Sequence, residues 1–167
     1  MIEAKEDFNN TWPFKANFFS GNGFKQHYVD EGKENKKLIL CLHGEPTWGY
    51  IYRHFIRELS KDFRVIVPDL MGFGKSETPK NKEYSLKTHV ENLENLVNYL
   101  KLENIYFVGQ DWGGPILGAY TLRNLKNTKC MFLINTILGY SRTEKPKELT
   151  PWFKWIKKNE DNGTLEV

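Results

Sequence analysis

The chain has 167 residues, with 24 Lys and Arg against 21 Asp and Glu, so its formal net charge is only +3. The lysines are spread along the chain instead of forming a basic patch interleaved with aromatic residues, which argues against a nucleic-acid-binding protein. No apolar run reaches the roughly 20 residues that a membrane-spanning helix needs, and the polar N-terminal sequence MIEAKEDFNN is unlike a signal peptide. We therefore expect a cytoplasmic globular domain with one sizeable core.

The two cysteines indicate a reduced protein. Cys41 and Cys130 each lie inside an apolar run, where a buried free thiol is more common than a disulfide. Two cysteines so far apart in the chain do not make a metal site. We expect neither a metal nor a cofactor.

The predicted elements alternate between strands and helices. Two short strands at residues 14–20 and 24–29 are joined by a Gly-Asn-Gly turn, and residues 30–37 form a polar loop. Apolar runs predict four further strands at residues 38–42, 64–70, 104–108 and 129–134. Helices are predicted at residues 50–60, 85–101 and 114–125. This alternation predicts the α/β class, with a mostly parallel sheet and helices on both faces.

Loops that follow parallel strands carry the functional residues in such folds, because the carboxyl ends of the strands share one edge of the sheet. One of these loops has the sequence GQDWGG at residues 109–114. Its spacing is that of a nucleophile elbow, G-x-Nu-x-G, with Asp111 in the place of the usual serine. A carboxylate there can form a covalent ester with a carbon electrophile. Taken alone, the same residues fit equally well an aspartate that caps a helix.

A second loop begins with His43-Gly44-Glu45-Pro46, directly after a buried strand. In this architecture that position supplies an oxyanion hole, in which the backbone N–H of Glu45 would join that of Trp112. We expect His43 to be a hydrogen-bonded histidine that fixes the loop, and not a catalytic residue.

A third loop, residues 69–76 (DLMGFGKS), partly matches a phosphate-binding loop. The pattern G-x-x-x-x-G-K-[ST] requires glycine at the position that Asp69 occupies. The loop is therefore predicted to be structural, and no nucleotide is implied.

Taken together, HGEPTW at 43–48, PDLMGFGKS at 68–76 and GQDWGG at 109–114 resemble the α/β-hydrolase superfamily, and specifically the haloalkane dehalogenases. YVDEG at 28–32 and LINTILG at 133–139 extend this resemblance over nearly the whole chain. The resemblance implies the α/β-hydrolase fold, with residues 1–139 as the N-terminal part of the core. Residues 140–167 would be the start of an incomplete cap domain.

The resemblance also implies a reaction. Asp111 would displace halide from a small halogenated hydrocarbon, and water would then hydrolyse the alkyl-aspartyl ester. Glu45 and Trp112 would contribute backbone N–H groups, and Trp112 would also be the first halide-binding residue. The second halide donor would be a cap tryptophan, with Trp152 as the first candidate and Trp155 as the second. The alternative is that these two cap tryptophans only pack a cap helix against the core.

The chain departs from the family pattern in one respect: all four of its histidines precede Asp111. In this fold the acid and the histidine of the triad follow the nucleophile. We therefore expect a fragment that completes at most the first half-reaction, with the sixth strand as an exposed apolar edge. Two other functions stay open: an epoxide hydrolase-like Asp hydrolase, and a catalytically inactive α/β-hydrolase that binds small molecules.

Overall fold

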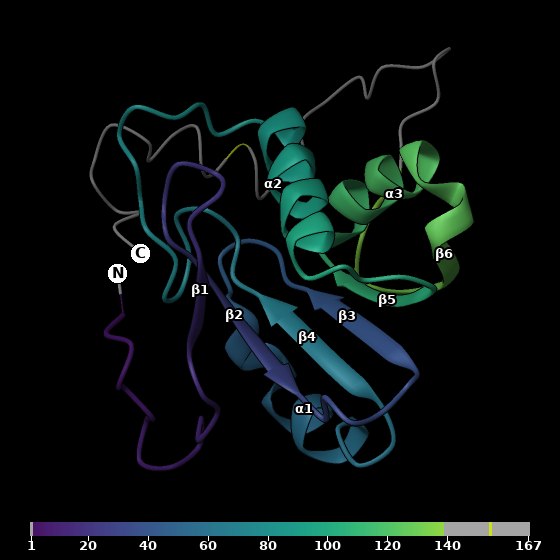
Figure 1. Ribbon diagram of the computed structural model, residues 1–167. Coiled ribbons are helices and arrows are strands. Elements are labelled where there is room, and N and C mark those ends of the chain that lie inside the picture. The colour runs from purple at the N-terminus through teal and green to yellow at the C-terminus, as the bar shows by residue number, and fades with distance from the viewer. Residues whose placement is uncertain (1, 139–153, 155–167) are drawn as a thin grey trace.

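The structure is a computed structural model that describes residues 2–138 and Lys154 (Figure 1). Its strands form one six-stranded sheet in the order β1-β2-β4-β3-β5-β6. The strands are β1 (Asn17–Phe19), β2 (Gln26–Glu31), β3 (Leu38–Leu42), β4 (Arg64–Pro68), β5 (Ile105–Gln110) and β6 (Thr128–Ile134). The helices are η1 (Gly49–Tyr52), α1 (Arg53–Leu59), α2 (Leu86–Tyr99), α3 (Gly113–Arg123) and η2 (Leu125–Asn127).

The sheet is mostly parallel, as predicted. β4, β3, β5 and β6 run parallel to one another, whereas β2 pairs antiparallel with β4 and β1 pairs antiparallel with β2. All five residues of β3 are buried, because this strand lies between β4 and β5 and is covered on both faces. The carboxyl ends of β3, β4 and β5 therefore lie next to one another at one edge of the sheet.

Helices cover both faces of the sheet (Figure 1). α2 and α3 pack on one face, where their apolar residues join those of β3 and β5 in the larger core cluster. α1 lies on the opposite face, with Ile56 completely buried against the sheet. α2 begins at an N-cap in which the Ser85 hydroxyl accepts a hydrogen bond from the Thr88 amide. None of the helices in the described ranges has the length and apolar character needed to cross a bilayer.

Several element boundaries differ from those predicted, and β1 keeps only Asn17–Phe19 of the strand predicted at residues 14–20. β2 continues to Glu31, two residues beyond the predicted strand, because Asp30 and Glu31 pair with β4. The charge of Asp30 is compensated there by Arg64, whose Nε and Nη2 each donate to the carboxylate at 2.9 Å. The helix predicted at residues 50–60 is divided, with the 3-10 turn η1 leading into α1.

The prediction that both cysteines are buried was wrong for one of them. Cys41 on β3 is buried, but Cys130 on β6 is exposed. Within residues 2–138 β6 pairs with β5 alone, and Phe132 on this strand is 61% exposed. The exposed apolar edge expected for the sixth strand is therefore present in the described residues. Because β6 lies at the edge of the sheet, an apolar run in this strand does not imply burial.

Asp69 ties together three segments at the carboxyl edge of the sheet. Its side chain is completely buried. Oδ1 accepts a hydrogen bond from the Gly49 amide at 2.8 Å, and Oδ2 accepts one from the Lys75 amide at 2.9 Å. Oδ2 also lies 2.8 Å from Nδ1 of His27 on β2. A buried carboxylate with these partners fixes the positions of the loops that follow β3 and β4.

The side chain of Lys75 has a structural role as well. Its ammonium donates to the backbone oxygens of Ala4 at 3.0 Å and Glu6 at 2.6 Å, which attaches the N-terminal segment to this loop. The lysine of a phosphate-binding loop would instead have to face an anion. The prediction that residues 69–76 form a structural loop is confirmed.

Replacement of Asp69 by asparagine should destabilise the protein strongly. The new side chain would bring an amide donor to a place where three donors converge, so at least one buried partner would lose its acceptor. We expect D69N to lower the free energy of unfolding by about 3 kcal/mol or more, as measured by urea denaturation. D62N, which makes the same change at an exposed residue, should change it by less than about 0.5 kcal/mol. Equal effects of the two substitutions would contradict the role assigned to Asp69.

Candidate active site

Asp111 lies in the sharp turn between β5 and α3, as the elbow spacing predicted. Its φ is 49°, in the left-handed region that residues other than glycine rarely occupy. Such a backbone conformation persists only where the surrounding structure enforces it, and it is frequent at functional sites. The turn places the carboxylate at the carboxyl edge of the sheet, directly before the N-terminus of α3.

The side chain of Asp111 meets the two backbone amides that the sequence singled out. Its Oδ1 accepts hydrogen bonds from the Glu45 amide at 2.9 Å and from the Trp112 amide at 2.7 Å. In the described residues no group donates a hydrogen bond to Oδ2. The structure therefore brings Asp111, Glu45 and Trp112 together, with Oδ1 held by two amides and Oδ2 without a donor among the described residues.

The sheet register explains why these groups meet. β3 and β5 are parallel neighbours, and Leu42 at the end of β3 pairs with Gly109 on β5. The loops that follow the two strands consequently start side by side. Gly44 lets them approach closely, since a Cβ atom at this position would overlap Oδ1 of Asp111 and the amide nitrogen of Trp112.

His43 fixes the loop after β3. Its ring is completely buried, and Nε2 accepts a hydrogen bond from the Leu70 amide at 2.9 Å. Nδ1 must therefore carry the proton, which it donates to the Gly44 oxygen at 2.9 Å. Burial lowers the pKa of His43 below its usual value, although the charge of Asp69 opposes this shift. The predicted structural role of His43 is confirmed.

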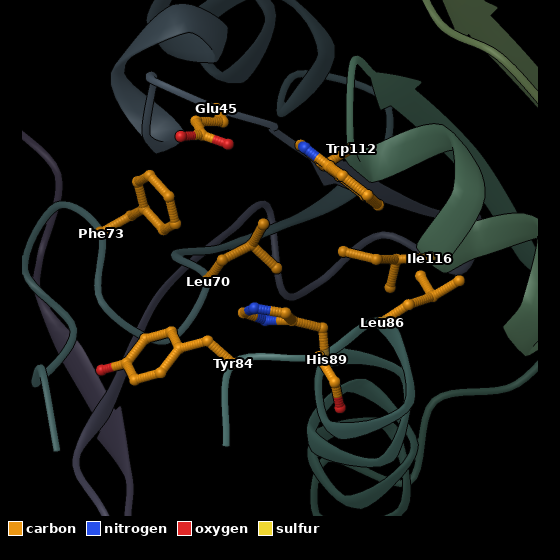
Figure 2. Close-up of a pocket in the computed structure, with 9 residues that line it drawn as sticks. Glu45, Leu70, Phe73, Tyr84, Leu86, His89, Trp112 and Ile116 are labelled. Atoms are coloured by element: carbon orange, nitrogen blue, oxygen red, sulfur yellow. The ribbon is translucent and has the colours of Figure 1, made fainter. Parts of the chain in front are cut away.

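A cavity of about 270 Å³ opens beside Glu45 and Trp112, the two residues whose amides donate to Asp111. Its walls come from the three loops, α2 and α3, and its lining residues are Glu45, Leu70, Phe73, Tyr84, Ser85, Leu86, His89, Trp112 and Ile116. Figure 2 shows Trp112 and Ile116 on one side, Phe73 and Tyr84 on the other, and His89 at the α2 end. The cavity is mostly apolar, which suits a small hydrophobic molecule.

Trp112 contributes both its backbone and its ring to this site. The indole is 42% exposed, and in Figure 2 its nitrogen is on the side that faces Glu45. An indole is a donor only, so it can bind an electron-rich atom but cannot accept a proton. The other predicted tryptophans, Trp152 and Trp155, lie outside the described residues.

His89 is a cavity residue that the sequence analysis did not single out. It lies on α2, and its buried Nδ1 has no hydrogen-bond partner among the described residues. Burial, together with repulsion from His43, lowers the pKa of His89. The signal in the sequence was its position three residues after Leu86, which places a histidine on the apolar stripe of this helix.

Metal binding finds no support in the described part of the chain, which has no group of three or more His, Cys, Asp or Glu side chains placed to hold an ion.

Residues 37–164 match the family described as the alpha/beta hydrolase fold, and the chain therefore belongs to this family. It is 36% identical over 158 residues to the cis-3-alkyl-4-alkyloxetan-2-one decarboxylase of Shewanella oneidensis, covering 93% of this chain and 48% of that protein. It is 38% identical over 125 residues to haloalkane dehalogenase 2 of Mycobacterium tuberculosis, covering 75% of this chain and 43% of that protein. The chain thus spans about half the length of the curated relatives it matches.

Solved structures agree with this assignment. The tetrameric haloalkane dehalogenase of Paraglaciecola agarilytica NO2 aligns with a TM-score of 0.81 at 33% identity, covering 90% of this chain and 52% of that one. The epoxide hydrolase CorEH aligns with a TM-score of 0.76 at 26% identity, covering 91% of this chain and 53% of that one. The resemblance to haloalkane dehalogenases is confirmed, and epoxide hydrolases are also among the structural neighbours.

The buried, neutral His43 should make the protein less stable in acid. Since its native pKa lies below the usual 6.5, the unfolded chain takes up a proton first as the pH falls. The contribution of His43 to the free energy of unfolding is therefore complete above about pH 6.5. Below that pH it declines by at most about 1.4 kcal/mol per pH unit. Urea denaturation between pH about 7.5 and about 5.5 should show this decline, to which His89 adds in the same direction.

H43Q should show a shallower decline than the unmodified protein, because a group that titrates differently in the two states has been removed. H54Q, which replaces an exposed histidine on α1, should keep the full decline. The same slope in H43Q and in the unmodified protein would contradict this assignment.

Proposed function

We propose that this member of the α/β-hydrolase family attacks carbon electrophiles with Asp111, and that it acts as a haloalkane dehalogenase. One observation carries the proposal. Oδ1 of Asp111 accepts hydrogen bonds from two backbone amides, while Oδ2 accepts none from the described residues. An apolar cavity is lined by Glu45 and Trp112, whose amides hold this carboxylate, and the Trp112 indole forms part of its wall. A nucleophile, a dry pocket and a donor for the leaving group are the three requirements of halide displacement.

The first step would use the free oxygen. Oδ2 of Asp111 attacks the carbon that carries the halogen, the C–O bond forms, and the C–X bond breaks with its electron pair leaving on the halide. Oδ1 then becomes the carbonyl oxygen of the ester and stays between the amides of Glu45 and Trp112. Because these donors are already in place, the carboxylate needs little reorganisation to react.

The leaving halide needs hydrogen-bond donors in surroundings that exclude water. The Trp112 indole could supply one N–H, and the apolar walls of the cavity would keep this interaction strong. The second donor is proposed to be Trp152, with Trp155 as the alternative, from the segment at residues 140–167 that we propose begins a cap domain. Residues 1–139 would then be the N-terminal part of the hydrolase core.

The second step would require water to attack the ester carbonyl. The negative charge of that intermediate would develop on Oδ1, where the same two amides could stabilise it. Of the four histidines, His43 uses both ring nitrogens, His27 pairs with Asp69 and His54 is exposed. His89 lines the cavity wall on α2. We therefore propose that the described residues of the site support ester formation, and we assign none of the four histidines as the base for hydrolysis.

An epoxide hydrolase-like reaction is the first alternative. Opening an epoxide with a carboxylate requires an acid that protonates the ring oxygen, a role suited to a pair of tyrosines over the nucleophile. Tyr84 is the one tyrosine among the described cavity residues. Its hydroxyl donates to the Pro79 oxygen at 3.3 Å, and burial raises its pKa, which makes it a weaker acid. The described cavity favours halide displacement over this alternative.

The decarboxylase relatives favour a second candidate substrate, a cis-3,4-dialkyl-oxetan-2-one. The ring carbon that bears the ring oxygen is an electrophile like a haloalkane carbon, so Oδ2 of Asp111 could displace the ring carboxylate from it. Loss of CO2 would then leave its C–C electron pair to form the alkene, as the C–O bond to Asp111 breaks and frees the carboxylate. This sequence consumes no water and needs no histidine.

Incubation of the protein with a short bromoalkane tests the leading proposal. We expect about one bromide per chain to be released, with the protein gaining the mass of the alkyl group, because no histidine in the described residues hydrogen-bonds to Asp111 and the ester would form without a positioned base to hydrolyse it. Bromide can be followed by ion chromatography and the adduct by intact-mass spectrometry. Sustained release of many bromide ions per chain would contradict the proposal that these residues form the ester but do not hydrolyse it.

Two variants identify the groups involved. D111N should give neither bromide nor adduct, whereas D62N, the matched change at an exposed aspartate, should behave as the unmodified protein. W112F keeps the backbone amide but removes the indole donor, and it should slow adduct formation by about tenfold or more. Binding of the bromoalkane without an adduct would instead favour the inactive binding protein.

Incubation with a cis-3,4-dialkyl-oxetan-2-one tests the second candidate. If this is the substrate, the alkene should accumulate over many turnovers per chain, since decarboxylation regenerates the Asp111 carboxylate. Gas chromatography measures the alkene, and D111N is the control. No alkene above the D111N level would exclude this candidate.

A further inference from the structure

A threonine beyond the end of β6 contacts the peptide that carries the nucleophile. The Thr136 hydroxyl donates a hydrogen bond to the backbone oxygen of Asp111 at 2.6 Å. The two residues are 25 positions apart in the sequence, so the contact depends on the pairing of β5 with β6. It is short for a hydrogen bond from a hydroxyl to a carbonyl oxygen and lies at the favourable end of the usual range.

The position of this bond matters because the Asp111 carbonyl and the Trp112 N–H belong to the same peptide unit. A peptide is planar and trans, so its C=O and N–H point in opposite directions. Anchoring the Asp111 oxygen on one side therefore aims the Trp112 N–H at the other side, where it donates to Oδ1 at 2.7 Å. Rotation of this peptide would remove one of the two donors from the carboxylate.

The described residues hold the backbone on the N-terminal side of this peptide only weakly. Asp111 has a φ of 49°, and its own amide makes only a long bond of 3.4 Å to the Ile134 oxygen. The Gly114 amide also donates to the Asp111 oxygen at 3.0 Å, but this bond lies within the turn itself. Thr136 supplies the anchor from a separate segment of the chain.

Gly114 leaves room for this threonine because it has no side chain. The elbow spacing G-x-Nu-x-G is complete at Gly113, so it does not by itself explain a second glycine. A Cβ atom at position 114 would overlap the hydroxyl oxygen of Thr136 and would lie 2.7 Å from its methyl carbon. The absence of a side chain at Gly114 is what allows the hydroxyl to reach the Asp111 oxygen.

We infer that Thr136 is a positioning residue that holds the Asp111–Trp112 peptide in the orientation in which the Trp112 amide faces the nucleophile. This inference rests on the proposed function for its kinetic consequence, but the orientation of the peptide can be measured without any substrate. Thr136 touches the backbone of Asp111 and acts through it.

The test compares T136V, which keeps the shape but removes the hydroxyl, with T136S, which keeps the hydroxyl but removes the methyl group. In single-turnover reactions with a bromoalkane, T136V should lower the maximal rate of adduct formation about tenfold, equivalent to about 1.4 kcal/mol. The half-saturating bromoalkane concentration should change by less than about twofold, because the cavity is untouched. T136S should stay within about twofold of the unmodified rate.

Amide hydrogen exchange at Trp112, followed by NMR without substrate, provides an independent reading. T136V should accelerate exchange of this amide and T136S should not, whether or not the protein reacts with bromoalkanes. If the unmodified protein forms no adduct, the proposed function fails and this exchange measurement alone decides the inference.

Three results would overturn the inference. T136V could keep both the unmodified rate and the unmodified exchange, so that the hydroxyl has no role. T136S could lose as much rate as T136V, which would assign the effect to methyl packing against Gly114. T136V could raise the half-saturating concentration at an unchanged maximal rate, which would place Thr136 in substrate binding.

Discussion

The site depends on one carboxylate oxygen that lies between two backbone amides. Oδ1 of Asp111 reaches both the Glu45 and the Trp112 N–H only because Leu42 pairs with Gly109 across neighbouring parallel strands. The cost is a left-handed backbone at Asp111, which adjacent loops and the end of β6 have to enforce. The parallel register of the sheet thus determines how the Asp111 carboxylate is oriented.

A buried carboxylate, that of Asp69, supports this arrangement. Asp69 binds amides from the loops after β3 and β4, and His43 joins the same two loops through both ring nitrogens. These contacts keep Glu45 in register with Asp111 and also shape the wall of the cavity at Leu70. Asp69 and His43 therefore hold the loops, and no donor in the described residues occupies Oδ2 of Asp111.

The sequence could predict those features that depend on residues close to one another in the chain. The apolar stripe of α2 marked this helix to within two residues, and the glycine spacing around Asp111 marked the elbow. It could not place Thr136 beside Asp111, because that contact depends on the pairing of β5 with β6. No local pattern around either residue indicates it. The exposure of Cys130 was missed for the same reason, since an apolar run does not state whether a neighbour covers it. His89 was visible only as a polar interruption of an apolar face.

The most direct test of the central claim is a crystal structure of the protein after reaction with a bromoalkane. We expect the alkyl chain on Oδ2 of Asp111, extending into the cavity, with Oδ1 still between the amides of Glu45 and Trp112. An unmodified Asp111 beside an alkylated Glu45 or His89 would contradict it. So would an ester whose carbonyl oxygen had left the two amides, because the held oxygen would then have no part in the chemistry.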